Sequence, residues 1–327
     1  MEKRARIIQG LSWVAALLLA AFVVAQLPLN SILHTIRALT PGQWLLWAGL
    51  NLAIIVLFTL RWWLLTRSPG MEIGFGRLLK IRQAGQAVSF ITPGPQFGGE
   101  PLQVYWLSKS SNMTGAKAVL SVALDRVYEF WFNFSILLLA VLILITSPLA
   151  NMADWQQTGA ILLGIILIMT LTIWVLFRHP DWISLWLQQM AFRWQNLSRL
   201  KNLDTHWQSA ARLFKELVST QKMSLLLAGG VTLAGWVGLL AELWLLLRFL
   251  HLSVDIFQFI FILVAMRLAF LLPLPGGIGT LEAALFWAFQ ALSFPAAAAI
   301  GLIALMRLRD AIVLVGGLIA IRLVKPS

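Results

Sequence analysis

Long, nearly uninterrupted runs of apolar residues dominate the chain and predict membrane-spanning helices. A helix needs roughly 20 apolar residues to cross a hydrocarbon layer about 30 Å thick. Six segments reach this length: residues 11–29, 44–65, 118–145, 159–177, 224–247 and 296–321. The first follows Lys3, Arg4 and Arg6, as in a signal peptide, but its apolar run is longer than an h-region and no clear cleavage site follows. We therefore expect a retained helix.

Two further apolar segments are each interrupted by a cluster of proline and glycine. Residues 78–91 lead into Pro93-Gly-Pro-Gln-Phe-Gly-Gly-Glu100-Pro, and residues 257–272 lead into Pro273-Leu-Pro-Gly-Gly-Ile-Gly-Thr-Leu-Glu282. A short apolar segment follows each cluster, at residues 102–107 and 283–292. Irregular backbone at membrane depth is tolerated only where protein buries it or where it lines a cavity. The pattern therefore predicts two re-entrant or broken-helix hairpins.

The interrupted segments belong to an internal repeat. The matched residues are Pro93 with Pro275, Gly94 with Gly276 and Glu100 with Glu282, each 182 residues apart, and Arg126 with Arg307 and Glu129 with Asp310, each 181 apart. The sequence thus predicts a first repeat over residues 44–147 and a second over 223–323, within one membrane domain over 1–327. The first hairpin would enter from the cytoplasm and the second from outside, so the repeats would be inverted, as in many transporters.

Composition supports a membrane protein and excludes several soluble classes. The 327 residues are 60% hydrophobic and 12% charged, and the mean hydropathy is +0.83; soluble domains average about 45–50% apolar and 25% charged residues. A soluble enzyme, a nucleic-acid-binding domain and a disordered protein are excluded. The chain has no cysteine, and its four histidines lie near loops without neighbouring ligands, so we expect no metal site and no cofactor.

The net charge of +12 is informative mainly through its distribution. Of the 25 Lys and Arg residues, eighteen lie in the predicted cytoplasmic segments, five within apolar segments, and only Arg37 and Arg248 on the other side. The positive-inside rule then places both termini in the cytoplasm. The overall prediction is an all-α polytopic membrane protein with about six full spans, two hairpins and two inverted repeats.

Charged residues within apolar segments or hairpin breaks are the main functional candidates, because each costs several kcal/mol unless it is paired or hydrated. They are Arg61, Arg126, Arg267, Arg307 and Arg309, with Glu100, Asp125, Glu129, Glu242, Glu282 and Asp310. Arg126 and Glu129, like Arg307 and Asp310, are three residues apart and can pair on one helix face. Two interpretations stay open: pairs that hold the halves in register, or arginines that contact an anionic headgroup while the acids pair with them or carry protons.

Glycines at the breaks suit the second interpretation. Gly98, Gly99, Gly276 and Gly277 permit tight turns and close approach of the backbone. Half-helices that begin after them would direct free N–H groups and a positive dipole end toward the midplane, which suits a phosphate.

Residues 178–222 form the one long polar connection, and their mixture of aromatic, leucine and basic residues predicts an amphipathic helix at the cytoplasmic interface. This connector either tethers the two halves or binds a partner or lipid.

At Pro-Gly-Pro-Gln-Phe-Gly-Gly-Glu100-Pro and Pro-Gly-Gly-Ile-Gly-Thr-Leu-Glu282-Ala the chain resembles, over essentially its whole length, the lysylphosphatidylglycerol synthase transmembrane family, which includes the flippase-like domain of the multiple peptide resistance factor. The resemblance implies an integral protein of a bacterial or archaeal plasma membrane, related to proteins that move an aminoacylated phospholipid between leaflets. It places Glu100 and Glu282 at the family's hairpin acids, and Arg126 and Arg307 at its helix arginines. The inside segments are too short for the transferase domain of the best-studied members, so lipid synthesis is not expected.

We expect a non-enzymatic lipid transporter that moves a phospholipid or another lipid with an anionic headgroup, without ATP hydrolysis because no Walker A motif is present. The headgroup would enter a midplane cavity formed by the two hairpins and lined by Arg126, Arg267 and Arg307, with Glu100, Glu129, Glu282, Asp310 and the break glycines nearby. The alternatives are a non-transporting assembly partner that docks through residues 178–222, or an enzyme or accessory subunit of lipid synthesis. The sequence leaves the substrate, the driving ion and a homo-oligomer open.

Overall fold

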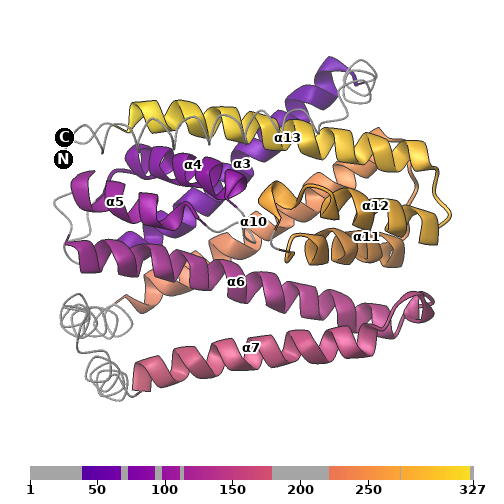
Figure 1. Cartoon of the computed structure of the whole chain (residues 1–327), viewed down its shortest axis with the longest axis horizontal. Helices are drawn as coiled ribbons and strands as arrows, with labels where there is room; N and C mark the ends of the chain where they lie inside the picture. The colour runs from indigo at the N-terminus through magenta and orange to yellow at the C-terminus, as the bar shows by residue number, and fades with distance from the viewer. Residues whose placement is uncertain are drawn as a thin grey trace, which may run out of the picture. The chain divides into compact units, whose positions relative to one another are not determined.

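The structure is a computed structural model, and it describes residues 39–67, 73–92, 98–110, 114–178, 221–272 and 274–324. Within these ranges every regular element is helical, as nine α-helices and two 3-10 turns (Figure 1). The predicted all-α class is confirmed for the described part of the chain. The expected first helix at 11–29, the motif residues 93–97 and nearly all of the connector 178–222 lie outside it.

Four long apolar helices are suited to crossing a membrane: α3 (Pro41–Thr66), α6 (Gly115–Ile145), α7 (Trp155–Arg178, of which Trp155–Thr172 qualifies) and α10 (Lys222–Phe249). They correspond to four of the six predicted spans. No more than 22% of the apolar stretch of any of them is buried by protein. Large apolar side chains that face away from protein are a sign of lipid contact. The chain is therefore a multi-pass membrane protein.

A fifth predicted span, at residues 296–321, forms helix α13 (Ala296–Leu323). Its 28 residues extend over about 42 Å at 1.5 Å per residue. Arg307, Arg309 and Asp310 interrupt its apolar sequence, so it is not among the helices that qualify as spans by composition. These three charges need partners within the protein.

The proline and glycine clusters separate short helices, as the sequence predicts. Helix α4 (Phe75–Ile91) precedes the first break and α5 (Glu100–Ser110) follows it. Helix α11 (Ile256–Ala269) precedes the second break, which contains the 3-10 turn η2 (Pro275–Gly277), and α12 (Thr280–Ala291) follows. With 17, 11, 14 and 12 residues, these helices span about 26, 17, 21 and 18 Å. Each is shorter than a hydrocarbon layer of about 30 Å.

The order of long, short, short and long helices occurs twice at a nearly constant spacing. Helices α3, α4, α5 and α6 begin at residues 41, 75, 100 and 115, and α10, α11, α12 and α13 begin at 222, 256, 280 and 296. The second set therefore starts 181, 181, 180 and 181 residues after the first, which is the spacing of the matched sequence motifs.

The chain forms two compact units, and each draws on both halves of the sequence. The first unit contains Met1–Asn51, Lys80–Pro101 and Leu240–Val324, and the second contains Leu52–Leu79, Leu102–Leu239 and Lys325–Ser327. In the first unit, α12 packs against both α11 and α13 (Figure 1). In the second unit, α6 and α7 lie side by side and are joined through the 3-10 turn η1 (Ala150–Met152). The residues that flank both breaks, and the charges of α13, belong to the first unit.

Helix α4 contacts α13 closely through a glycine. A Cβ atom added at Gly317 would lie 2.5 Å from the Cβ atom of Ala87 and 2.5 Å from the carbonyl oxygen of Gln83. Ala87 and Ile91 form an apolar cluster with Leu314 on the same face of α13. The backbone of the first broken segment is thus held directly against the helix that carries Arg307.

Substitution of Gly317 by alanine is expected to destabilise the protein by about 1–3 kcal/mol, because the added methyl group forces α4 and α13 apart. The unfolding of purified protein in detergent micelles measures the effect. Gly316→Ala is the matched control, since nothing lies within 4 Å of a Cβ atom at that position. Equal stability of the two variants would contradict the close helix contact.

Candidate functional site

The second break turns two backbone carbonyl groups toward one arginine. Gly276, Gly277 and Gly279 have φ angles of 57°, 62° and 83°, in the left-handed region that side chains other than glycine rarely adopt. The carbonyl oxygens of Gly276 and Gly277 accept hydrogen bonds from Arg307 of α13, at 2.8 Å and 3.0 Å. The glycines therefore allow a backbone conformation in which a helix break binds a cation.

Arg307 uses every N–H group that its guanidinium possesses. Nε and Nη2 donate to the two carboxylate oxygens of Glu282 at 2.7 Å and 2.9 Å, and Nη1 donates to Asp310 at 3.1 Å. Together with the two glycine carbonyls, these bonds account for the five donors of an arginine. Only 2% of the Arg307 side chain is exposed. Arg307, Glu282, Asp310 and the carbonyl groups of Gly276 and Gly277 form one cluster, which we call the clamp. It joins α13, the break and the start of α12.

Glu282 connects this clamp to the end of a helix. Its Oε2 atom also accepts the N–H group of Gly279 at 2.8 Å, so the carboxylate caps the first turn of α12. An anion is favourable there, because the first N–H groups of a helix lack partners within it. The Glu282 side chain is 28% exposed, against 12% for Asp310 and 2% for Arg307. It is the most accessible member of the clamp.

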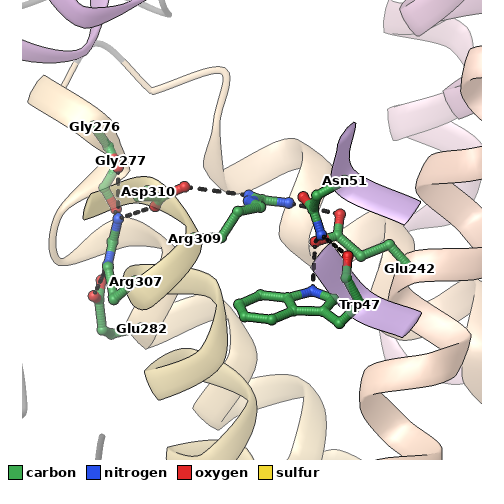
Figure 2. A network of polar contacts seen from close by, with 9 residues as sticks. All are labelled: Trp47, Asn51, Glu242, Gly276, Gly277, Glu282, Arg307, Arg309 and Asp310. Carbon is green, nitrogen blue, oxygen red and sulfur yellow. Dashed lines mark hydrogen bonds and ion pairs between the residues drawn. The ribbon is translucent and has the colours of Figure 1, made fainter. Parts of the chain in front are cut away.

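The polar contacts continue from Asp310 across to α10 and α3 (Figure 2). Asp310 also accepts a bond from Arg309 at 3.3 Å, and Arg309 donates to Glu242 of α10 at 2.9 Å. Glu242, only 3% exposed, further accepts bonds from the indole of Trp47 at 3.1 Å and the amide of Asn51 at 3.0 Å. One chain of contacts thus links α3, α10, α13, the second break and α12.

In the described part of the first break, too, an acid accepts the N–H group of a preceding glycine with positive φ. The N–H group of Gly98, whose φ is 130°, donates to Oε2 of Glu100 at 2.7 Å. The N–H group of Gly99 donates to Ser89 at 2.9 Å, and a Cβ atom at Gly99 would collide with the carbonyl group of Gly85. The chain therefore folds back onto α4, and Glu100 accepts an N–H group from just before α5.

The end of α4 lies against the second break through an aromatic ring. A Cβ atom at Gly276 would lie 2.6 Å from the ring of Phe90, near the end of α4. Phe90 also contacts the apolar cluster between α4 and α13. The end of α4 is thus next to the break that Arg307 holds.

A second set of buried ion pairs lies in the other unit. Arg61 of α3, whose side chain is fully buried, contacts Asp125 at 2.8 Å and Glu129 at 3.4 Å, both on α6. Arg126 also contacts Glu129, at 3.0 Å. These pairs allow α6 to carry charge in an otherwise apolar sequence.

Equivalent positions of the two halves carry opposite charge. Arg61 of α3 and Glu242 of α10 are 181 residues apart, which is also the spacing between the starts of these helices. Arg61 pairs with acids on α6, whereas Glu242 pairs with Arg309 on α13. In the ion pair between α3 and α6, α3 thus carries the positive charge, whereas in the pair between α10 and α13, α10 carries the negative charge.

The predicted site residues are divided between the two units, and hydrogen bonds to Arg307 bring together Gly276, Gly277, Glu282 and Asp310. Gly98, Gly99, Glu100, Arg267, Gly276, Gly277, Glu282, Arg307 and Asp310 belong to the first unit, and Arg126 and Glu129 belong to the second. Both predicted pairs, Arg126 with Glu129 and Arg307 with Asp310, are confirmed. Arg267 is partly buried in the last turn of α11. Among the described residues, no three His, Cys, Asp or Glu side chains are arranged to hold a metal.

Several members of these networks lie outside the predicted headgroup site. Glu242, Arg309, Arg61 and Asp125 were charged candidates from the sequence but were not assigned to that site, and Trp47 and Asn51 were not candidates. The common offset of Arg61 and Glu242 was a usable signal, whereas nothing in the sequence distinguishes Trp47 and Asn51 from other residues of α3. The half-helices were expected to present free N–H groups, which stays a prediction; the two break acids accept the N–H groups of Gly98 and Gly279, just before α5 and α12 begin.

These features define a polytopic membrane protein with a buried polar site at interrupted helices. The chain belongs to the family described as the lysylphosphatidylglycerol synthase TM region, whose profile matches residues 9–317. It is 26% identical over 277 residues to a UPF0104 membrane protein of Methanothermobacter thermautotrophicus, a match that covers 81% of this chain and 79% of that protein. No solved structure matches the chain.

Replacement of Glu242 by leucine is expected to destabilise the protein by up to about 3–5 kcal/mol, because Arg309 loses the closer and more buried of its two carboxylate partners. The double variant Glu242→Leu/Arg309→Leu removes both charges, leaves Asp310 paired with Arg307, and should recover most of that loss. Denaturant unfolding in micelles measures both. Losses that simply add would show that Glu242 and Arg309 do not stabilise each other.

Proposed function

We propose that this protein moves a lipid with an anionic headgroup between the two leaflets, and that Arg307 and the flanking breaks form the headgroup site. Membership of a family named for a lipid synthase and the multi-pass fold support a role in lipid handling. The headgroup contacts the polar residues while the acyl chains stay in the surrounding lipid. The chain acts as a transporter and not as an enzyme.

The observation that carries this proposal is the two-point contact between Arg307 and Glu282. The planar guanidinium donates two parallel hydrogen bonds to the two oxygens of one carboxylate. Phosphate presents its oxygens with a similar spacing, and arginine binds both groups in the same way. The site is therefore already shaped for an anion, and Glu282 occupies it in this structure.

The short helices provide the membrane architecture of the proposal. We place α4–α5 and α11–α12 in the membrane as two re-entrant hairpins of inverted repeats, because each of the four helices is shorter than a hydrocarbon layer of about 30 Å. The excess of basic residues in the intervening segments supports a cytoplasmic location for both termini. We place the protein in the plasma membrane of a bacterium or archaeon, which its family and the archaeal relative support.

Replacement of Arg307 by lysine is expected to lower lipid movement roughly tenfold or more, because an ammonium group cannot make the planar two-point contact. The assay uses proteoliposomes with fluorescent phosphatidylglycerol in both leaflets, and dithionite then quenches the label that reaches the outer leaflet. Arg322→Lys is the matched control, since Arg322 is an exposed residue in the last turn of the same helix.

Wild-type protein should expose the inner-leaflet label faster than protein-free vesicles do, and the control should match the wild type. Full activity of a folded Arg307→Lys variant would remove Arg307 from the site. Wild-type vesicles that behave like empty ones would contradict lipid movement itself.

A further inference from the structure

The clamp around Arg307 couples anion binding to a proton. We propose that the phosphate of a bound headgroup replaces the Glu282 carboxylate on Arg307, and that Glu282 leaves in its protonated form, so that one proton is taken up with each headgroup. This inference rests on the proposed function and concerns the same site.

A ligand can reach Arg307 only by exchange. All five N–H groups of the guanidinium have acceptors, and the side chain is almost fully buried. An incoming phosphate must therefore displace one of Glu282, Asp310 or the two glycine carbonyl groups.

Glu282 is the partner that can leave. The carbonyl groups of Gly276 and Gly277 are part of the backbone turn. Asp310 is shared with Arg309, which Glu242 holds in turn, so its movement would break several buried contacts. The side chain of Glu282 is more exposed than those of Asp310 and Glu242, and it is long and flexible.

The departure of Glu282 opens a set of donors that converge on one point. Nε and Nη2 of Arg307 and the N–H group of Gly279 all donate to Glu282 in this structure. A phosphate in place of the carboxylate would accept all three, two from the arginine and one from the start of α12. The Glu282 carboxylate thus stands where the phosphate oxygens would lie.

Protonation of Glu282 keeps the charge of the site constant during the exchange. One negative charge leaves as the carboxylate gains a proton from water, and one negative charge arrives with the phosphodiester. The charged residues on the helices that pack against α12 are Arg267 and the capping Asp255 at α11, and Arg307, Arg309, Asp310 and Arg322 on α13. Of these, Arg307 contacts the Glu282 carboxylate directly, so its loss favours the neutral acid in a weakly polar environment.

Calorimetric titration of the full-length protein in micelles tests the exchange. The probe is dihexanoyl phosphatidylglycerol, titrated at one pH in two buffers with different enthalpies of ionisation. The difference in apparent binding enthalpy gives the number of protons taken up, which should be about one. The affinity should fall by up to about tenfold for each unit that the pH rises.

The variant Glu282→Gln should still bind the probe, with no proton uptake and with an affinity independent of pH. Glu282→Asp keeps a titratable group and should retain the uptake. Asp255→Asn is the matched control, because Asp255 also caps a helix, through the N–H groups of Phe257 and Gln258. Its proton number should equal that of the wild type.

The outcomes separate the two proposals. Wild-type binding without proton uptake overturns the exchange and leaves the proposed function intact, and uptake that persists in Glu282→Gln also overturns it. Absence of any binding overturns both. Equal binding of glycerophosphoglycerol, the same headgroup without acyl chains, with one proton would support the exchange and contradict a lipid as the ligand.

Discussion

A guanidinium group placed in an apolar helix must find acceptors within the protein, and this requirement organises the first unit. Arg307 obtains them from three sources: a neighbouring acid on its own helix, the acid at the start of α12, and two carbonyl groups that only a glycine turn can direct inward. The backbone of the break therefore supplies two of the hydrogen-bond acceptors of Arg307. Asp310 also contacts Arg309, Arg309 donates to Glu242, and Glu242 accepts hydrogen bonds from Trp47 and Asn51. One chain of polar contacts thus connects five segments to a single buried cation.

The elements that could be predicted from the sequence are those fixed by local rules. Apolar length determined α3, α6, α7 and α10, and the proline and glycine clusters located the interruptions after α4 and α11. The spacing of three residues determined the pairs Arg126–Glu129 and Arg307–Asp310. The contacts of Arg61 with Asp125 and of Arg309 with Glu242 join residues more than 60 positions apart. Such contacts depend on which helix faces lie together, which local pattern does not encode.

The roles of the break acids illustrate the same limit. The sequence located Glu100 and Glu282 correctly beside flexible glycines, and it indicated helix starts suited to an anion. It could not show that each acid accepts an N–H group from its own break. In the structure, the donors of Arg307 and Gly279 are bonded to the Glu282 carboxylate, a contact between distant residues that the local sequence does not encode. The aromatic contact between Phe90 and Gly276 likewise depends on the meeting of two segments that are distant in the chain.

The reversed ion pairs of the two halves have a consequence for how the chain assembles. Two halves with the same order of helices could in principle exchange equivalent helices during folding. If α3 took the place of α10, Arg61 would meet Arg309, and if α10 took the place of α3, Glu242 would meet Asp125 and Glu129. Like charges brought together away from water are strongly unfavourable, so each long helix is rejected by the other's partner. The opposite charges thus favour the pairing of α3 with α6 and of α10 with α13 over the exchanged arrangement.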